Sequence, residues 1–337
     1  MSSSETITPK TTFHSPRLLR EHMHHISVTI VSLTLAFLSI IGLFPENIWQ
    51  IILLTIGVAL IGVPHGALDH WYGWTLLNTR VGRWWPLIFF AGYGVVMSCV
   101  VVGWFGIPMF TLLLFLGLSA LHFGYEDIQQ RTLPILFQPF VALAVGSMVI
   151  WIPYFVHETR IQELFRWIAP GTLEDIVIPP TILFLVMGCV LLGYLANLGI
   201  DAVRHQSPDS MVEIFRIVSL GLLFATATPL LSFTVYFCAW HSIRGLIHLA
   251  KDMAPDNDFR GWKLLVQRSF PLTGLTLLLA ACGSWFLWRT DTIAPNLIQI
   301  VFLGLSVIAI PHLLLHLVCE HVFEVNPFAQ VRTTAGD

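Results

Sequence analysis

Long apolar runs follow one another along almost the whole chain, and each is long enough to cross a lipid bilayer. Ten runs can be drawn, at about residues 26–43, 50–70, 86–104, 108–125, 134–156, 179–199, 212–228, 231–250, 270–288 and 296–318. A bilayer core of about 30 Å needs roughly 17–25 apolar residues per helix. Backbone groups in lipid must be paired within the spanning structure, and the runs lack the alternation of a β-barrel. The sequence therefore predicts an all-α, polytopic transmembrane helix bundle of about ten helices.

The composition agrees with lipid as the solvent for most of the surface. Of the 337 residues, 55% are hydrophobic and only 11% are charged, with a mean hydropathy of +0.76. Soluble domains carry about a quarter charged residues. The net charge of −3 offers no basic face, which argues against nucleic-acid binding. The five cysteines lie in apolar runs without CxxC spacing, so we expect buried thiols instead of disulfides or a zinc site.

Basic residues indicate the orientation of the chain. With the ten runs as drawn, 13 of the 17 lysines and arginines fall on the side of the N-terminus, 3 fall on the opposite side, and Arg244 lies inside the eighth run. The positive-inside rule then places both termini in the cytoplasm. We expect a cytoplasmic tail over residues 1–25, a single transmembrane domain over 26–320 and a second cytoplasmic tail over 321–337.

Histidines and charged residues lie inside four of the runs, where an ionisable group is costly and needs a partner or a task. They occur in the strings GVPHGALDH, LHFGYED, WHSIRGLIH and IPHLLLH. The residues are His65, Asp69, His70, His122, Glu126, Asp127, His241, Arg244, His248, His312 and His316. All four runs cross in the same direction, so each histidine is expected in the cytoplasmic half of its helix. Four helices that bring imidazoles to one depth predict a metal site in the bundle.

The ligand chemistry favours a particular metal. Imidazole suits iron, zinc, copper or nickel, and several histidines without thiolates, with an open coordination position, suit non-haem iron and oxygen chemistry. Asp69 follows His65 by four residues, so both face one side of a helix, and the carboxylate is placed to orient a liganding imidazole. Asp127 follows His122 by five residues and is less well phased.

The residues alone leave other interpretations open. A lone intramembrane histidine is often only an interhelical hydrogen-bond partner, and chains of histidines and carboxylates also form proton relays. Arg244 is either a buried counter-ion of Asp69 or Asp127, or a side chain that extends to the interface. The histidines within residues 22–25 are expected to form a solvated patch at the membrane edge.

The strings GVPHGALD, LHFGYED, YFCAWHSIR and IPHLLL, in this order, resemble the Brp/Blh family of membrane β-carotene dioxygenases from bacteria and archaea. The resemblance spans about residues 50–318. It implies a multi-pass protein of a prokaryotic inner (plasma) membrane that cleaves the central double bond of a carotenoid with dioxygen to give retinal. It also implies a functional link to a retinal-binding rhodopsin.

The resemblance further implies an Fe(II) cofactor held by four histidines. By motif position, His65, His122 and His241 are the catalytic metal ligands, and we assign Asp69 and Asp127 as residues that support the cofactor.

The fourth family histidine lies four residues after the third, and this chain has Gly245 there. His248, seven residues after His241 and about 10.5 Å along a helix, is our predicted replacement, with His316 or water as alternatives.

Two other functions remain as alternatives. A membrane desaturase or hydroxylase acting on lipid usually shows several HxxxH or HxxHH boxes, whereas this chain has one, His312–His316. A transporter or a non-catalytic protein that binds carotenoid or retinal is the second alternative. The lack of an obvious internal repeat counts mildly against a transporter.

Overall fold

The computed structural model describes residues 16–170, 180–255, 257–287 and 293–321, and these are helical with short connections and no strand. The elements in chain order are α1 (Pro16–Ile40), α2 (Ile48–Gly57), η1 (Val58–Gly62), α3 (Val63–Gly66), α4 (Asp69–Val81), η2 (Gly82–Trp84), α5 (Trp85–Gly106), α6 (Pro108–Asp127), η3 (Gln130–Thr132), α7 (Gln138–Gly146), α8 (Met148–Val156), α9 (Glu158–Ile168), α10 (Pro180–Arg204), α11 (Pro208–Thr226), α12 (Pro229–Thr234), η4 (Val235–Ser242), α13 (Ile243–Met253), α14 (Asp258–Leu287) and α15 (Ile293–His321). The predicted all-α class is confirmed.

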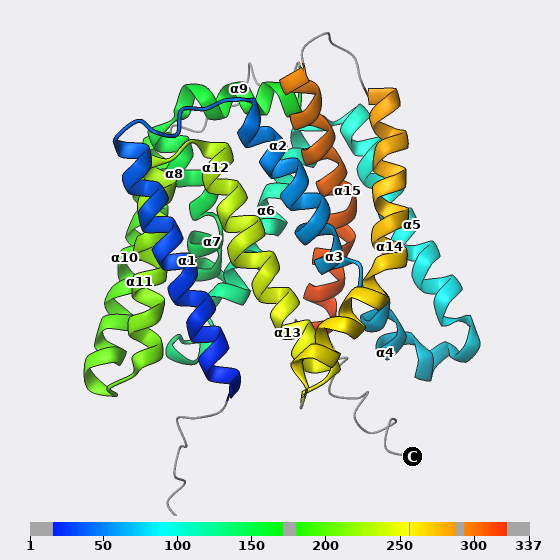
Figure 1. Cartoon of the computed structure of the whole chain (residues 1–337), viewed down its shortest axis with the longest axis horizontal. Helices are drawn as coiled ribbons and strands as arrows, with labels where there is room; N and C mark the ends of the chain where they lie inside the picture. Colours follow the sequence, from blue (N-terminus) through cyan, green and yellow to red (C-terminus); the bar gives the residue numbers. More distant parts are fainter. Residues whose placement is uncertain (1–15, 171–179, 256, 288–292, 322–337) are drawn as a thin grey trace, which may run out of the picture.

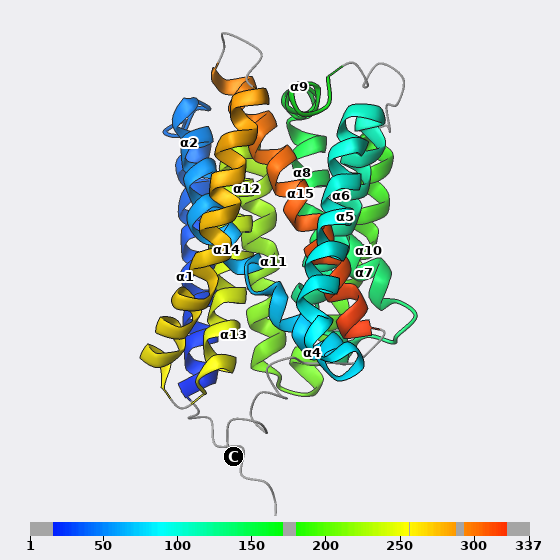
Figure 2. The same cartoon turned by 90° about the vertical axis from the view of Figure 1, so that its right-hand side faces the viewer.

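The long helices stand side by side as an upright bundle (Figures 1 and 2). In Figure 1, α1, α10 and α11 lie on one side, α5 and α14 lie on the other, and the short α9 lies across the upper end. Helix α9 buries Ile161, Leu164 and Ile168 against the bundle. Its Arg160 makes two 2.7 Å contacts with the carboxylate of Glu46, from the connection after α1. This end of the bundle is therefore closed by an amphipathic helix.

Fewer segments of the described chain qualify as membrane spans than the ten predicted apolar runs. By length and composition, seven described segments are suited to cross a membrane, or eight if α7 and α8, bent by 52°, form one span. The 59-residue segment Ile48–Gly106 counts once although it contains two of the predicted runs. Helix α11 is not among the seven, and it carries Asp209, Glu213 and Arg216.

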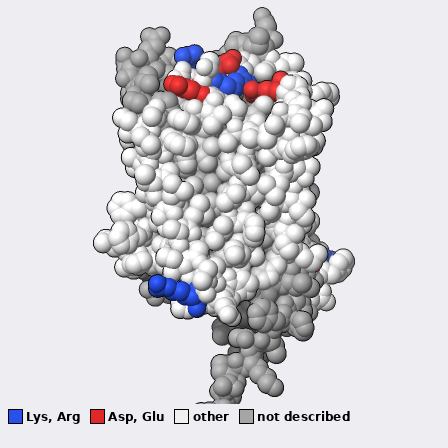
Figure 3. Space-filling view, turned by 90° about the vertical axis from the view of Figure 1, so that its left-hand side faces the viewer, with Lys and Arg blue, Asp and Glu red and all other residues white. Residues whose placement is uncertain are grey.

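The outer surface of the bundle fits a lipid environment. Large apolar side chains are exposed around the perimeter, among them Phe37, Leu87, Val102, Leu192 and Leu278. On the face shown in Figure 3, charged side chains gather at the two ends and a broad uncharged belt lies between them. The chain is therefore a helical membrane protein.

The predicted tails are only partly described. Residues 1–15 and 322–337 lie outside the described residues. Helix α1 begins at Pro16, so the last ten residues of the predicted N-terminal tail belong to a helix.

The carboxylate of Asp127 is the centre of a buried polar cluster at the end of α6. Its Oδ1 accepts hydrogen bonds from Trp240 Nε1 at 2.8 Å and Arg244 Nη1 at 2.7 Å. Its Oδ2 accepts from Tyr236 OH at 3.0 Å and Arg216 Nη1 at 3.2 Å. Asp127 thereby ties α6 to α11, η4 and α13. The sequence left open whether Arg244 is a buried counter-ion or a side chain that extends to the interface. In the structure it is a counter-ion of Asp127.

The charges of this cluster balance within the bundle. Arg216, which is 2% exposed, also donates to both carboxylate oxygens of Glu213 one helical turn earlier. Two guanidinium groups, from Arg216 and Arg244, thus face the two carboxylates of Glu213 and Asp127. A buried ion cluster is tolerated only when charges are paired and hydrogen bonds are satisfied. Glu213 and Arg216, at the start of the apolar run over residues 212–228, therefore have charged partners inside the bundle.

Helix α1 packs against the same cluster through its histidines. The His24 ring stacks on Trp240 at 5.4 Å between centroids, and the His25 ring meets it edge-on at 4.6 Å. His24 Nε2 also donates to the Ala239 carbonyl at 2.8 Å. The expectation of a solvated patch over residues 22–25 is therefore wrong for these two histidines, because α1 crosses η4 at this depth.

We expect Asp127→Ala to destabilise the bundle strongly. Four donors would lose their acceptor, and removing one partner of a buried ion pair costs about 3–5 kcal/mol. Unfolding by denaturing detergent in micelles measures the change. The matched control is Asp209→Ala, which removes a partly exposed carboxylate paired with Arg131 and should cost at most about 1 kcal/mol. Equal losses for the two variants would contradict this account of the cluster.

Candidate metal centre

Four histidines from four separate helices lie together in the lower half of the bundle. Ring centroids are 5.2 Å apart for His65 and His241, 5.3 Å for His241 and His122, 5.5 Å for His122 and His312, and 5.5 Å for His312 and His65. The four imidazoles thus form a closed ring of neighbours. His316 lies beside it, 5.4 Å from His122 and 4.3 Å from His312. Histidines from four of the predicted apolar runs therefore lie together in the structure.

The helices that carry these histidines run in one direction, away from α9 and toward the end where α1 begins (Figures 1 and 2). Two of them contain π-helical turns next to the site, since η1 directly precedes α3 with His65 and η4 contains His241. Such turns shift the phase of the following side chains and are frequent at functional sites. At Gly62 an added Cβ would lie 2.7 Å from the Phe237 ring, so this glycine allows η1 to approach η4 closely.

The ring nitrogens of the cluster fit a metal ion. Both nitrogens of His65 and the Nε2 atoms of His122 and His312 are buried and have no hydrogen-bond partner within the described part of the chain. Each unpaired buried polar group costs about 1–3 kcal/mol. Imidazole nitrogens are among the ligand atoms that iron and similar metals bind. A bound metal ion would take one nitrogen from each of these imidazoles.

A carboxylate completes the group around His122 and His241. Glu126 lies one helical turn after His122, with its Oε1 3.4 Å from His122 Nε2 and its Oε2 3.3 Å from His241 Nδ1. One ligand atom of each of these three residues lies within 4.8 Å of the others. Glu126 therefore joins the potential ligands of the site.

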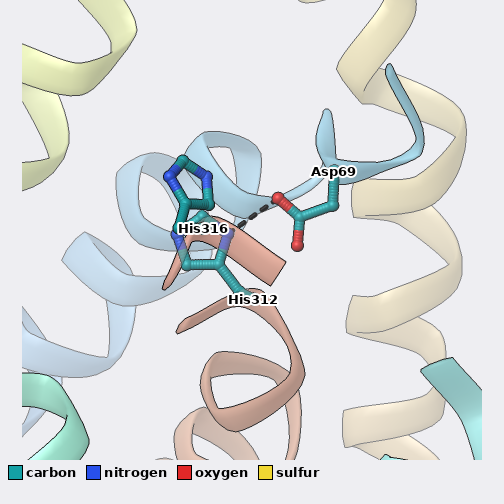
Figure 4. A group of neighbouring side chains, drawn as sticks. All are labelled: Asp69, His312 and His316. Atoms are coloured by element: carbon teal, nitrogen blue, oxygen red, sulfur yellow. Dashed lines mark hydrogen bonds and ion pairs between the residues drawn. The ribbon is translucent and has the colours of Figure 1, made fainter. Parts of the chain in front are cut away.

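A second carboxylate lies on the other side of the cluster, next to α15. Asp69 Oδ1 is 2.7 Å from His312 Nδ1, and its Oδ2 accepts from Tyr93 OH at 2.8 Å. Figure 4 shows Asp69 facing the His312 ring, with His316 beside that ring. The ligand atoms of Asp69, His312 and His316 also lie within 4.8 Å of one another.

The structure places the remaining predicted site residues differently. His248 is exposed on α13, whereas the clustered imidazoles are not, so the geometry gives no support to its role as a ligand. Asp127 accepts hydrogen bonds from four donors in the ion cluster. The carboxylate next to His122 and His241 is instead that of Glu126. Asp69 does orient an imidazole, but that of His312 instead of His65.

Two further candidate site residues were present in the motifs without an assigned role. Glu126 follows His122 at i+4, which is the spacing that brings side chains together on a helix, and this signal was available in the sequence. His312 lies 243 residues from Asp69, so its pairing depends on the tertiary structure.

An apolar cavity of about 280 Å³ adjoins the histidines. Its lining includes His65, His122, His241 and His312 and continues along α5, α6, α12, α14 and α15 to α9. The volume is close to the lower end of the range for ligand pockets. Imidazoles beside an apolar cavity in a helical membrane protein are the arrangement that a metal site acting on a lipid-soluble molecule would need.

Comparison with known proteins agrees with this interpretation. Residues 56–319 match the family described as "Beta-carotene 15,15'-dioxygenase". The chain is 25% identical over 263 residues to the beta-carotene 15,15'-dioxygenase of an uncultured marine bacterium, covering 77% of this chain and 90% of that protein. It is 23% identical over 286 residues to the probable beta-carotene 15,15'-dioxygenase Blh of Halobacterium salinarum, covering 77% and 81%. No solved structure matches the chain.

The chain therefore belongs to the beta-carotene 15,15'-dioxygenase family, a family of carotenoid-cleaving oxidoreductases. This confirms the resemblance drawn from the four sequence motifs. Helix α1 lies outside the matched residues, in agreement with an N-terminal addition.

The departure at Gly245 has a structural correlate. A Cβ at this position would lie 2.0 Å from Cε1 and 2.3 Å from Nδ1 of His65. The His65 ring therefore fills the space into which a side chain at position 245 would extend, so these two positions are coupled.

We expect Gly245→Ala to displace the His65 ring and weaken metal binding by at least about tenfold. Titration of the purified, metal-free protein with Co(II), followed by visible absorption, measures the affinity. Gly274→Ala is the matched control, because no atom outside its own helix turn lies within 4 Å of the added Cβ. Wild-type affinity in Gly245→Ala would show that the two positions are not coupled.

Proposed function

We propose that the chain is a membrane non-haem iron dioxygenase that cleaves the central double bond of β-carotene, or of a related carotenoid, to retinal. The observation that carries the proposal is the apolar cavity lined at one end by clustered imidazoles, in a member of this family. Both curated relatives have names that specify the 15,15' bond.

His65, His122 and His241 would hold the iron, with Glu126 beside the last two. When bound, iron supplies the site at which dioxygen is activated. In the overall reaction the central carbon–carbon double bond is broken and each of its carbons receives one atom of the same dioxygen molecule. Two aldehydes form, so the reaction needs no further reductant.

Aromatic side chains of α12 and η4 are placed to bind a flat polyene. The Phe233 and Phe237 rings are stacked at 5.5 Å with an angle of 3°, and Phe237 is stacked with His241 at 6.0 Å and 22°. All three residues line the cavity. A conjugated chain lying along these parallel faces would be led to the histidines, which fixes the bond that meets the metal.

The cavity also reaches the outer surface of the bundle. Phe90 of α5 and Leu275 and Leu279 of α14 line it and are 47%, 51% and 56% exposed. A substrate dissolved in lipid would enter between these two helices without crossing water. The apolar walls would keep bulk water from the histidines during the reaction.

The proposal includes a location in the inner membrane of a prokaryote, with both termini in the cytoplasm and one transmembrane domain. The excess of basic residues on one side of the bundle supports this orientation. The histidines would then lie in the cytoplasmic half of the membrane. Retinal would leave on the lipid side, where a retinal-binding membrane protein could take it up.

Expression in bacteria that make β-carotene tests the proposal directly. We expect retinal in chromatograms of cell extracts from the wild type and none from His65→Ala, because the metal loses a ligand. His205→Ala, at the exposed end of α10, is the matched histidine control and should yield wild-type retinal. Unchanged carotene with the wild type present in the membrane would refute β-carotene cleavage.

The cavity has its own test, independent of the metal. Ala309 of α15 lines the cavity, so Ala309→Trp should block the polyene and lower retinal yield at least about tenfold while iron content is unchanged. Ala281→Trp, on the exposed surface of α14, is the control with the same added volume. Full activity of Ala309→Trp would exclude this cavity as the substrate site.

A further inference from the structure

We propose that His312 of α15 is the fourth protein ligand of the metal and takes the place of the histidine that this chain lacks at position 245. The inference rests on the proposed function only in that a metal binds among the imidazoles. It assigns a residue outside the family's ligand pattern and follows from three features of the structure.

The first feature is the closure of the imidazole ring. His241 contacts His65 and His122, at 5.2 and 5.3 Å between centroids, and His312 contacts the same two rings at 5.5 Å each. His312 therefore occupies the corner opposite His241. Of the two candidates considered from the sequence, His248 is exposed, while His316 contacts His122 and His312 and lies beside the closed ring instead of at one of its corners.

The second feature is the tautomer that the surroundings impose on His312. Asp69 Oδ1 lies 2.7 Å from His312 Nδ1, and an ionised carboxylate only accepts, so Nδ1 carries the proton. The lone pair is then on Nε2, which is buried and has no hydrogen-bond partner among the described residues. A carboxylate behind the ring is the arrangement that orients metal-bound histidines and makes them more basic.

The Asp69 carboxylate is itself held in place. Tyr93 OH lies 2.8 Å from Asp69 Oδ2 and 3.2 Å from the Ile308 carbonyl, one turn before His312 on α15. The Asp69 side chain comes from the first residue of α4, just after the break that follows α3. Tyr93 and Asp69 thus connect α5 and α4 to the one face of α15 that presents His312.

The third feature is the space at Gly245. The family pattern would place an imidazole there, but the His65 ring lies where its Cβ would be. The His65 ring occupies the corner between His241 and His312, in contact with both. The absence of a side chain at Gly245 therefore allows the His65 ring to take the position in which it contacts His312.

The test measures metal affinity in purified protein without turnover. Metal-free wild type, His312→Ala, His312→Gln and His248→Ala are titrated with Fe(II) under anaerobic conditions and with Co(II), and metal content is measured after gel filtration. We expect one ion per chain in the wild type and in His248→Ala. Both His312 variants should lose at least about tenfold in affinity and change the Co(II) absorption, which reports the ligand set.

Asp69→Asn adds a variant that keeps all imidazoles. Loss of a carboxylate behind a liganding histidine typically lowers metal affinity about 10–100-fold, and Tyr93→Phe should show a smaller loss in the same direction. Insertion into the membrane and elution as a single species show that each variant has folded. A folded Asp69→Asn protein with unchanged metal affinity would overturn the orienting role of Asp69 and with it the assignment of His312.

The outcomes separate this inference from the proposed function. A folded wild type that binds no metal would refute both. Metal bound equally by the wild type and the His312 variants would overturn the inference and leave the proposed function intact, as would a loss in His248→Ala alone. Two ions per chain would also overturn it, because Asp69, His312 and His316 would then hold an ion of their own.

Discussion

The cost of placing ionisable groups inside an apolar bundle is the constraint that shapes the polar interior of this chain. The structure meets that cost at two neighbouring places. One is the ion cluster, in which the opposite charges of Asp127, Glu213, Arg216 and Arg244 balance. The other is the imidazole cluster, in which ring nitrogens have no hydrogen-bond partner among the described residues and are available to a metal. The first place has its partners within the protein, and the second is left open for a ligand.

The two clusters are joined through a few residues of α6 and η4. Glu126, which contacts His122 and His241, directly precedes Asp127, which binds Trp240 next to His241. A shift of either element would therefore disturb the ion cluster and the imidazoles together. Helix α1, which lies outside the residues matched by the family, also supports the ion cluster, because its histidines pack on the indole of Trp240. We infer that the ion cluster sets the position of the η4 imidazole before any metal binds.

Sequence reasoning predicted the parts of the site that depend on composition and depth, and missed those that depend on helix phase and tertiary contact. The shared depth of imidazoles in four apolar runs predicted a metal site, and the motif positions of the family resemblance picked out His65, His122 and His241 as its ligands. His248 was predicted from α-helical phase after His241, but it is exposed near the middle of α13, while His241 is buried in η4. Asp69 was expected to serve His65 on a continuous helix, whereas the chain breaks between α3 and α4 and turns Asp69 toward α15. The ten apolar runs correspond to only seven or eight segments that qualify by length and composition, because charged α11 does not qualify and the Ile48–Gly106 segment counts once although it contains two runs.

The source of the fourth imidazole changes what metal binding does to the fold. Two histidines at i and i+4 would form a clip within one helix, and the metal would then connect three helices. With His312 as the ligand, the metal connects α3, α6, η4 and α15, four segments far apart in the chain. Metal affinity then depends on the packing of α15 against the rest of the bundle, and bound metal stabilises that packing in return. Because α15 also lines the cavity, the same contacts that hold the metal fix the wall along which the polyene would lie.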